Sequence, residues 1–235
     1  MNEIPEILTF MKKVRPWYPR MLASVANTCK HPYTLHVQYD SDSTAFKACN
    51  EVIKRSTSRY ICICDDDVEF IEDNWLLTLV DILKKYENLG CVVPVEIKTE
   101  EQLATFRNLG HDKMVAGLSY VWSCSVAPGY VTMFDRMRVP HLYCDENMPG
   151  YYGMSDIDLA MQVRDAGYDV GMTSAVIVTH MRKSNDARLR KEWGLVQEED
   201  LTMNTEQQHY MRQKWGDLYM NTEKQVIFEK FDKRV

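Results

Sequence analysis

Residues 60–64, Tyr-Ile-Cys-Ile-Cys, form an uninterrupted apolar run that ends abruptly in three aspartates, Asp65, Asp66 and Asp67. A short apolar run of this kind is typical of a strand that is buried on both faces, in a sheet covered by helices on both sides. The carboxyl ends of such strands form the ligand-binding edge of open α/β sheets. The run therefore predicts an α/β fold with a polar site directly after the strand.

The three adjacent carboxylates have two readings. They repel one another, and a bound divalent cation would relieve that repulsion. They would equally suit a solvated acidic turn at the start of the next helix. An EF-hand loop does not fit, because Phe70 and Leu76 stand where the loop requires glycine and a bidentate glutamate. The chain also has no Gly-Lys pair, which excludes a P-loop.

The first hundred residues alternate between short apolar runs and segments of helical periodicity. Strands are expected around residues 7–10, 33–39, 60–64 and 91–93, and helices around 21–29, 45–52 and 76–83. This order predicts a mostly parallel central sheet flanked by helices, because parallel neighbours need crossover connections. Beyond an irregular region, a helix is expected from about residue 155, and a strand at 175–178 leads to His180.

Composition sets the outer limits. The chain has 235 residues, which suits one domain with one core, and its net charge of -6 lacks the basic surplus of proteins that bind nucleic acid backbones. Its seven scattered cysteines argue against a disulfide framework, and they lack zinc-ligand spacing. With no signal peptide and no run of membrane-spanning length, we expect a cytoplasmic protein without an integral membrane segment.

Three elements at wide separation follow a fixed order: the acidic triplet, the acidic pair Asp156 and Asp158 at the start of a helix, and His180 after an apolar strand. In this order they resemble the nucleotide-sugar glycosyltransferases of the GT-A fold, most closely the inverting enzymes of family 2. The resemblance covers about residues 4–182. Further matches to the family pattern are Asp40 and Asp42 in the segment YDSDS, Asn50, Arg164, Gly167, Tyr168 and, near the end, Lys214, Trp215 and Gly216.

The resemblance implies a single GT-A domain over residues 1–235. A nucleotide-sugar-binding half would span residues 1–95, an acceptor and catalytic half residues 96–183, and a helical C-terminal tail residues 184–235.

The resemblance also implies a metal site. Asp65, Asp67 and His180 are its ligands, with Asp65 as an alternative contact to the ribose. Carboxylate oxygens suit both Mn²⁺ and Mg²⁺, and an imidazole suits Mn²⁺ somewhat better. The cation would neutralise the charge that develops on a departing nucleoside diphosphate.

An inverting transfer needs a base for the acceptor hydroxyl, and the acidic pair supplies the catalytic candidates, Asp156 and Asp158. On an ideal helix they lie about 200° apart, so that only one of them faces a substrate. The family pattern favours Asp156 as the base, and Asp158 is then expected to serve structure. The alternative is a capping box formed by Ser155, Ile157 and Asp158, in which the acids only begin the helix.

The donor is expected to be a UDP-sugar, because Asp40 stands where the family reads the uracil ring N–H. The residues expected to bind the donor nucleotide are Phe10, Asp40, Asp42, Asn50, Asp65, Asp66, Arg182 and Lys183. A turn-forming Asp-Ser-Asp describes the segment around Asp42 equally well.

The acceptor is expected to be a saccharide hydroxyl or a hydroxylated base in DNA. The second option depends on the basic cluster Arg182, Lys183, Arg188, Arg190 and Lys191. Two other functions use the same residues: a nucleotidyltransferase, which would release pyrophosphate, and a non-catalytic module that only binds nucleotide sugars.

Overall fold

The computed structural model describes residues 2–11, 14, 16–39, 43–96, 119–124, 127–150, 153–180, 197–220 and 229–231. Its strands are β1 (Glu6–Met11), β2 (Thr34–Tyr39), β3 (Tyr60–Cys64), β4 (Val68–Phe70), β5 (Leu89–Glu96), β6 (Ser119–Cys124), β7 (Val131–Asp135), β8 (Asp169–His180) and β9 (Glu229–Phe231). Its helices are α1 (Tyr18–Thr28), α2 (Ala45–Arg55), α3 (Trp75–Lys85), α5 (Ser155–Asp165), α7 (Gln197–Trp215) and α8 (Asp217–Met220).

The strands form one sheet in the order β2-β1-β3-β7-β5-β8-β6-β9, with β4 paired to β8 at the side. β1 is parallel to both β2 and β3, and β5 is parallel to β8, as the alternating pattern predicts. β7, however, is inserted antiparallel between β3 and β5, and β6 is antiparallel to β8. The sheet is therefore mixed, and both β6 and β7 come from the region that lacks the strand-helix alternation.

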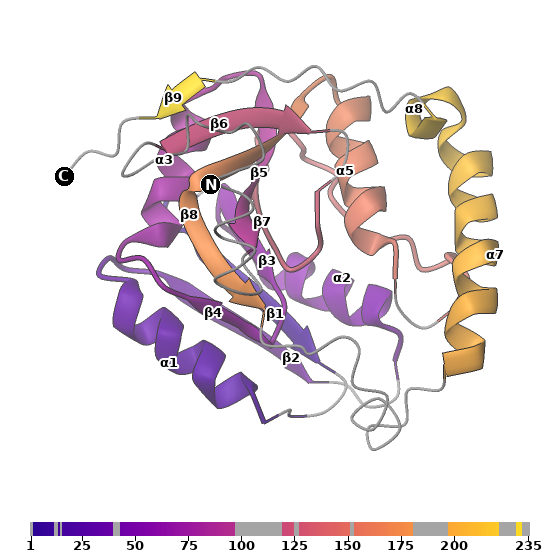
Figure 1. Ribbon diagram of the computed structural model, residues 1–235, viewed down its shortest axis with the longest axis horizontal. Coiled ribbons are helices and arrows are strands. Elements are labelled where there is room, and N and C mark those ends of the chain that lie inside the picture. Colours follow the sequence, from indigo (N-terminus) through magenta and orange to yellow (C-terminus); the bar gives the residue numbers. More distant parts are fainter. Residues whose placement is uncertain are drawn as a thin grey trace, which may run out of the picture.

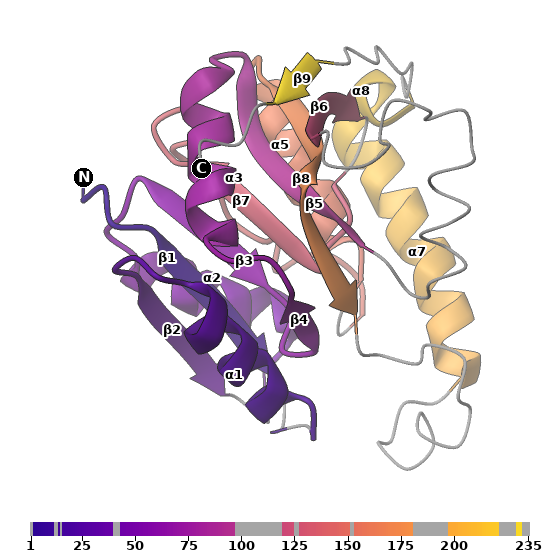
Figure 2. The same ribbon diagram turned by 60° about the vertical axis from the view of Figure 1, so that its left-hand side comes forward.

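Helices cover both faces of the sheet (Figures 1 and 2). α1 and α3 lie on one side of it, and α2 and α5 lie on the other. α2 illustrates why such segments become helical. The Thr44 side chain caps its first turn by accepting a hydrogen bond from the Lys47 N–H, and its apolar positions, Phe46, Cys49 and Val52, are buried against the sheet.

The predicted buried strand is confirmed, since every residue of β3 is buried. It is paired on one side with β1 and on the other with β7. α1 connects β1 to β2 on one side of β1, and α2 then connects β2 to β3 on the other side of β1. The carboxyl end of β1 is therefore a topological switch point of the sheet. The polar site is expected at this edge.

β8 is paired with β5 along both of its halves, but its other neighbour changes from β6 to β4. Its first half lies between β5 and β6, whereas its end pairs with β4. The register against β5 shifts after Thr173, and the carboxylate of Glu72 accepts a hydrogen bond from the Ile177 N–H at 2.6 Å, just beyond this shift. The shift therefore redirects the last residues of β8 toward β4 (Figure 1).

Within the described part of the chain, no helix combines the length and the apolar character that crossing a membrane requires. All seven cysteines are free thiols, as their scattered positions predict.

Candidate active site

The three aspartates occupy the turn between β3 and β4, directly after the buried strand. Asp65 is anchored through its backbone, because its N–H donates to the carbonyl oxygen of Tyr130 at 2.9 Å. Its side chain remains 41% exposed, whereas Asp67 is 1% exposed. Asp66 is also buried and faces α1, where burial first and then the charge of Asp66 raise the pKa of Tyr18.

The short strand β4 brings His180 to this turn. β4 pairs antiparallel with the end of β8, and Val68 lies opposite His180. Because Val68 directly follows Asp67, this register places the imidazole beside the Asp67 carboxylate. Residues more than a hundred positions apart in the sequence thus meet at the edge of the sheet.

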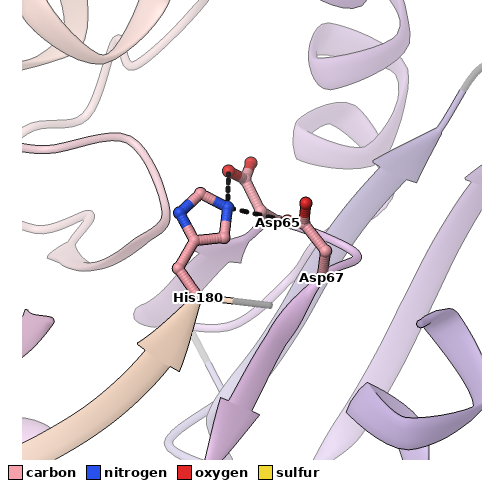
Figure 3. A group of neighbouring side chains, drawn as sticks. All are labelled: Asp65, Asp67 and His180. Atoms are coloured by element: carbon pink, nitrogen blue, oxygen red, sulfur yellow. Dashed lines mark hydrogen bonds and ion pairs between the residues drawn. The ribbon is translucent and has the colours of Figure 1, made fainter. Parts of the chain in front are cut away.

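The resulting triad is shown in Figure 3, with His180 at the end of β8 and the two carboxylates on the turn. The Nε2 atom of His180 lies 2.9 Å from Oδ1 of Asp67 and 3.8 Å from Oδ2 of Asp65. One ligand atom from each of the three residues lies within 4.8 Å of the others, a spacing at which all three can share one cation.

A third carboxylate, Glu96 at the end of β5, approaches the other nitrogen of the ring. Its Oε1 lies 3.5 Å from Nδ1 of His180. Burial alone would lower the pKa of His180, but the hydrogen bonds to Asp67 and Glu96 and the charges of Asp67 and Asp65 outweigh it and raise the pKa to about 10. Without a metal ion, His180 is therefore a cation at neutral pH, and a metal that binds here must displace its proton.

Asp156 lies in the first turn of α5, and its carboxylate packs against Gly129. A Cβ atom added to Gly129 would lie 2.9 Å from the Cβ and 3.1 Å from the Oδ2 of Asp156, so only glycine allows this approach. Burial raises the pKa of Asp156, and hydrogen bonds from backbone N–H groups, including those of Ile157 and Gly129, offset part of that effect.

The neighbouring residue, Tyr130, connects Asp156 to the triad. Its carbonyl oxygen accepts the hydrogen bond from Asp65, and its ring centroid lies 6.0 Å from that of His180. The Tyr130 hydroxyl is fixed by donating to the carbonyl oxygen of Pro94 at 2.7 Å. The two-residue segment 129–130 thus touches the helix-start carboxylate with one residue and the Asp-Asp-His triad with the other.

Comparison with known proteins gives one family match and several matches in fold. The family model described as glycosyl transferase family 2 matches residues 23–137, which include the acidic triplet. A solved mannosyltransferase from Pyrobaculum calidifontis, in complex with GDP-Man and Mn²⁺, superposes with a TM-score of 0.58 over 79% of this chain at 13% identity. The chain therefore has the GT-A fold, and its residues 23–137 are similar to glycosyl transferase family 2. GalNAc-T7, solved with UDP, GalNAc and Mn²⁺, superposes with a TM-score of 0.56 over 76% of this chain at 10% identity.

The chain matches only part of each of these solved proteins. It covers 59% of the mannosyltransferase chain and 43% of the GalNAc-T7 chain. At this level of identity the likeness concerns the GT-A fold, and it confirms the α/β fold class predicted from the alternating pattern.

The triad Asp65, Asp67 and His180 has the chemistry of a site for a divalent metal. Two carboxylates supply hard oxygen donors, and one imidazole supplies a borderline nitrogen donor, a set that Mn²⁺ accepts and that Mg²⁺ accepts less readily. Asp67 and His180 are held in place by burial and by the β4–β8 pairing, so that little of this site has to form when the ion binds.

Asp158, the second member of the acidic pair, points away from this site and is completely buried. Its carboxylate accepts hydrogen bonds from Lys214 Nζ at 2.8 Å, Trp215 Nε1 at 2.8 Å and Gln162 Nε2 at 2.9 Å. These contacts agree with a structural role for Asp158. The alternative of a capping box is wrong, because the N-cap residue of α5 is Met154 and no side chain caps that end.

Asn50, expected beside the nucleotide, is engaged in holding a loop. Its side chain accepts from the Cys144 N–H at 2.7 Å and donates to the Cys144 carbonyl oxygen and to Glu146 Oε1, both at 2.8 Å. Phe10 lies near the carboxyl end of β1 and is packed, partly buried, against the core.

Four of the expected nucleotide-binding residues, Asp40, Asp42, Arg182 and Lys183, lie outside the described residues. Glu96 and residues 129–130 also lie at the site, but they could not be identified from the sequence because they belong to no recognisable motif. The one signal in the sequence is the Pro128-Gly129 pair, which indicates a turn but not its neighbours.

Proposed function

We propose that this protein is a metal-dependent, inverting glycosyltransferase that moves a sugar from a UDP-sugar to a hydroxyl group of an acceptor. The observation that supports this proposal most directly is the segment 129–130, which touches both Asp156 and the Asp-Asp-His triad. If these residues have the proposed roles, a site for the leaving diphosphate and a base for the acceptor would lie close to each other, as a displacement at one carbon atom requires.

On the donor side, Asp65, Asp67 and His180 would hold Mn²⁺ or Mg²⁺. The ion would supply positive charge against the diphosphate as the bond to the sugar breaks. The two solved GT-A proteins support a nucleotide-sugar donor, since one was solved with GDP-Man and the other with UDP and GalNAc, both with Mn²⁺. UDP is our choice because Asp40 follows β2, where related enzymes read the base.

On the acceptor side, Asp156 would remove the hydroxyl proton. The acceptor oxygen forms its bond to the anomeric carbon on the face opposite the diphosphate, the bond from that carbon to the phosphate oxygen breaks, and its electron pair leaves with the diphosphate. The configuration at the anomeric carbon is thereby inverted. Because burial raises the pKa of Asp156, its carboxylate is a stronger base than an exposed aspartate.

The test is a screen of UDP- and GDP-sugars with Mn²⁺, in which release of the nucleoside diphosphate is measured with and without candidate acceptors. Asp156→Asn should retain donor binding and lose transfer by several orders of magnitude. Asp165→Asn, at the exposed end of the same helix, is the matched control and should stay active.

Each alternative gives a different product pattern. Release of pyrophosphate would identify a nucleotidyltransferase, and donor binding without any turnover would identify a binding module. Near-normal transfer by Asp156→Asn would refute the assignment of the base.

For the acceptor we propose a saccharide hydroxyl. A hydroxylated base in DNA is the competing acceptor, and it depends on the basic cluster within residues 182–191, which lies outside the described residues. A gel-shift assay with duplex and single-stranded DNA at several salt concentrations separates the two, because binding through phosphates weakens steeply as salt rises.

A further inference from the structure

One face of helix α7 contacts the beginning of α5. Gln207 and Met211 are buried on this face, and Lys214 and Trp215 continue it at helical spacing. Gln207 Nε2 donates to the Pro149 carbonyl oxygen at 2.7 Å, before α5 begins. Figure 1 shows α7 running alongside α5 at the edge of the molecule.

The N-cap residue of α5 supplies no capping side chain. This residue, Met154, has a left-handed backbone with φ of 51° and no capping hydrogen bond from its side chain. The preceding Gly153 has φ of 104°, and a Cβ atom there would lie 2.9 Å from Oε1 of Gln207. Tertiary contacts with α7 therefore add to the hydrogen bonds that Asp156 accepts from N–H groups of its own turn.

The strongest of these contacts are made by Asp158. Lys214 Nζ and Trp215 Nε1 both donate to Oδ1 of Asp158 at 2.8 Å. Lys214 also pairs with Asp145 at 2.7 Å, so one partly buried cation is shared by two buried carboxylates. The buried Asp158 carboxylate resists displacement, because moving it away from these donors leaves a buried charge without compensation.

Asp156 and Asp158 belong to the same helical turn and point to nearly opposite sides of it. Asp158 points toward α7, whereas Asp156 points toward Gly129. Any rotation of the turn that moves one carboxylate also moves the other. Fixing Asp158 therefore fixes the direction of Asp156.

We infer that Lys214 and Trp215 are positioning residues for the transfer reaction: through Asp158 they hold Asp156 at the distance from the acceptor that proton removal requires. This inference rests on the proposed function, in which Asp156 is the base. Displacing a reacting group by about 1 Å lowers a rate by about a hundredfold, so small losses of constraint in this turn should be visible in kcat.

The test compares two substitutions that each delete one hydrogen-bond donor from α7 and leave a phenyl ring at the position. Trp215→Phe removes the N–H that binds Asp158, while Tyr210→Phe removes the hydroxyl that binds Asp145 at 2.8 Å. Both leave Lys214 in place, so the buried carboxylates keep their cation. Trp215→Phe should lower kcat by about tenfold or more, with the acceptor KM and the Kd for UDP with Mn²⁺ unchanged within about twofold. Tyr210→Phe should change none of them by more than about twofold.

Hydrogen exchange provides a readout that does not depend on activity. The Gly129 N–H contacts the Asp156 carboxylate, and its exchange should accelerate in Trp215→Phe but not in Tyr210→Phe. Lys214→Arg, which keeps the charge, should retain more activity than Lys214→Met at equal folded fraction.

Equal kcat in the two aromatic variants would overturn the inference, as would faster exchange in Trp215→Phe without a fall in kcat. If the unmodified protein transfers no sugar from any donor, the proposed function fails. The exchange comparison still decides whether the α7 contact holds Asp156, and equal exchange in the two variants would overturn the inference on its own.

Discussion

The imidazole of His180 gives the metal site a pH dependence that can be measured. Hydrogen bonds to Asp67 and Glu96, with the charges of Asp67 and Asp65, raise the pKa of His180 to about 10 despite the opposing effect of burial. Below that pH the metal-free protein keeps the proton, which a metal ligand has to lose. We therefore predict that Mn²⁺ affinity rises with pH and levels off only when the pH approaches the pKa of His180.

The size of the effect follows from the pKa. A pH of 7 is about 3 units below the pKa of His180, so deprotonating the imidazole at this pH costs about 4 kcal/mol. The apparent Kd for Mn²⁺ should therefore fall about tenfold for each pH unit between pH 6 and 8, with about one proton released for each ion bound.

Isothermal titration calorimetry with Mn²⁺, in pairs of buffers with different ionisation enthalpies, counts these protons directly. His180→Asn keeps an oxygen donor without a titrating group, so it should bind Mn²⁺ with no pH slope over this range. The control is His36→Asn, since His36 also contacts a buried carboxylate, Glu6, at 3.1 Å but makes that contact away from the site. Proton release near zero in the unmodified protein, or an unchanged slope in His180→Asn, would refute the reasoning.

Three further predictions concern the site and its support. Asp67→Ala should abolish Mn²⁺-dependent binding of UDP, measured by the same calorimetry, because it removes the buried ligand of the triad. Gly129→Ala should lower transfer by about a hundredfold with donor binding retained, because the new Cβ would lie 2.9 Å from the Cβ of Asp156 and displace that carboxylate. Normal turnover in this variant would contradict the assigned position of the base. Asn50→Ala should lower the free energy of unfolding in urea by about 2 to 4 kcal/mol, because it leaves the buried N–H and C=O of Cys144 without the Asn50 side chain; a smaller loss would mean that water replaces it.

The elements that carry the site could be read from local pattern. The apolar run of β3, the helical stripes of α2 and α3, and the strand that leads to His180 are all found where periodicity predicts them. Periodicity succeeds here because it reports which side of a segment is buried, and that follows from the side chains of the segment alone. The acidic triplet and His180 could likewise be identified as candidates from their chemistry.

Which strands and side chains lie next to each other could not be predicted from local pattern and is seen only in the folded chain. Nothing local predicts that β7 enters antiparallel between β3 and β5, or that three residues after the acidic turn form a strand opposite the end of β8. Those pairings place His180 beside Asp67 and bring Tyr130 to Asp65. The contact of α7 with Asp158 is of the same kind.

The sequence by itself thus determined the kinds of elements and the candidate ligands of this protein. The tertiary structure determined which of those groups meet, because strand neighbours, register and helix docking depend on contacts between distant segments. The free energy of such contacts comes from shared burial and paired charge, and neither is a property of any one segment.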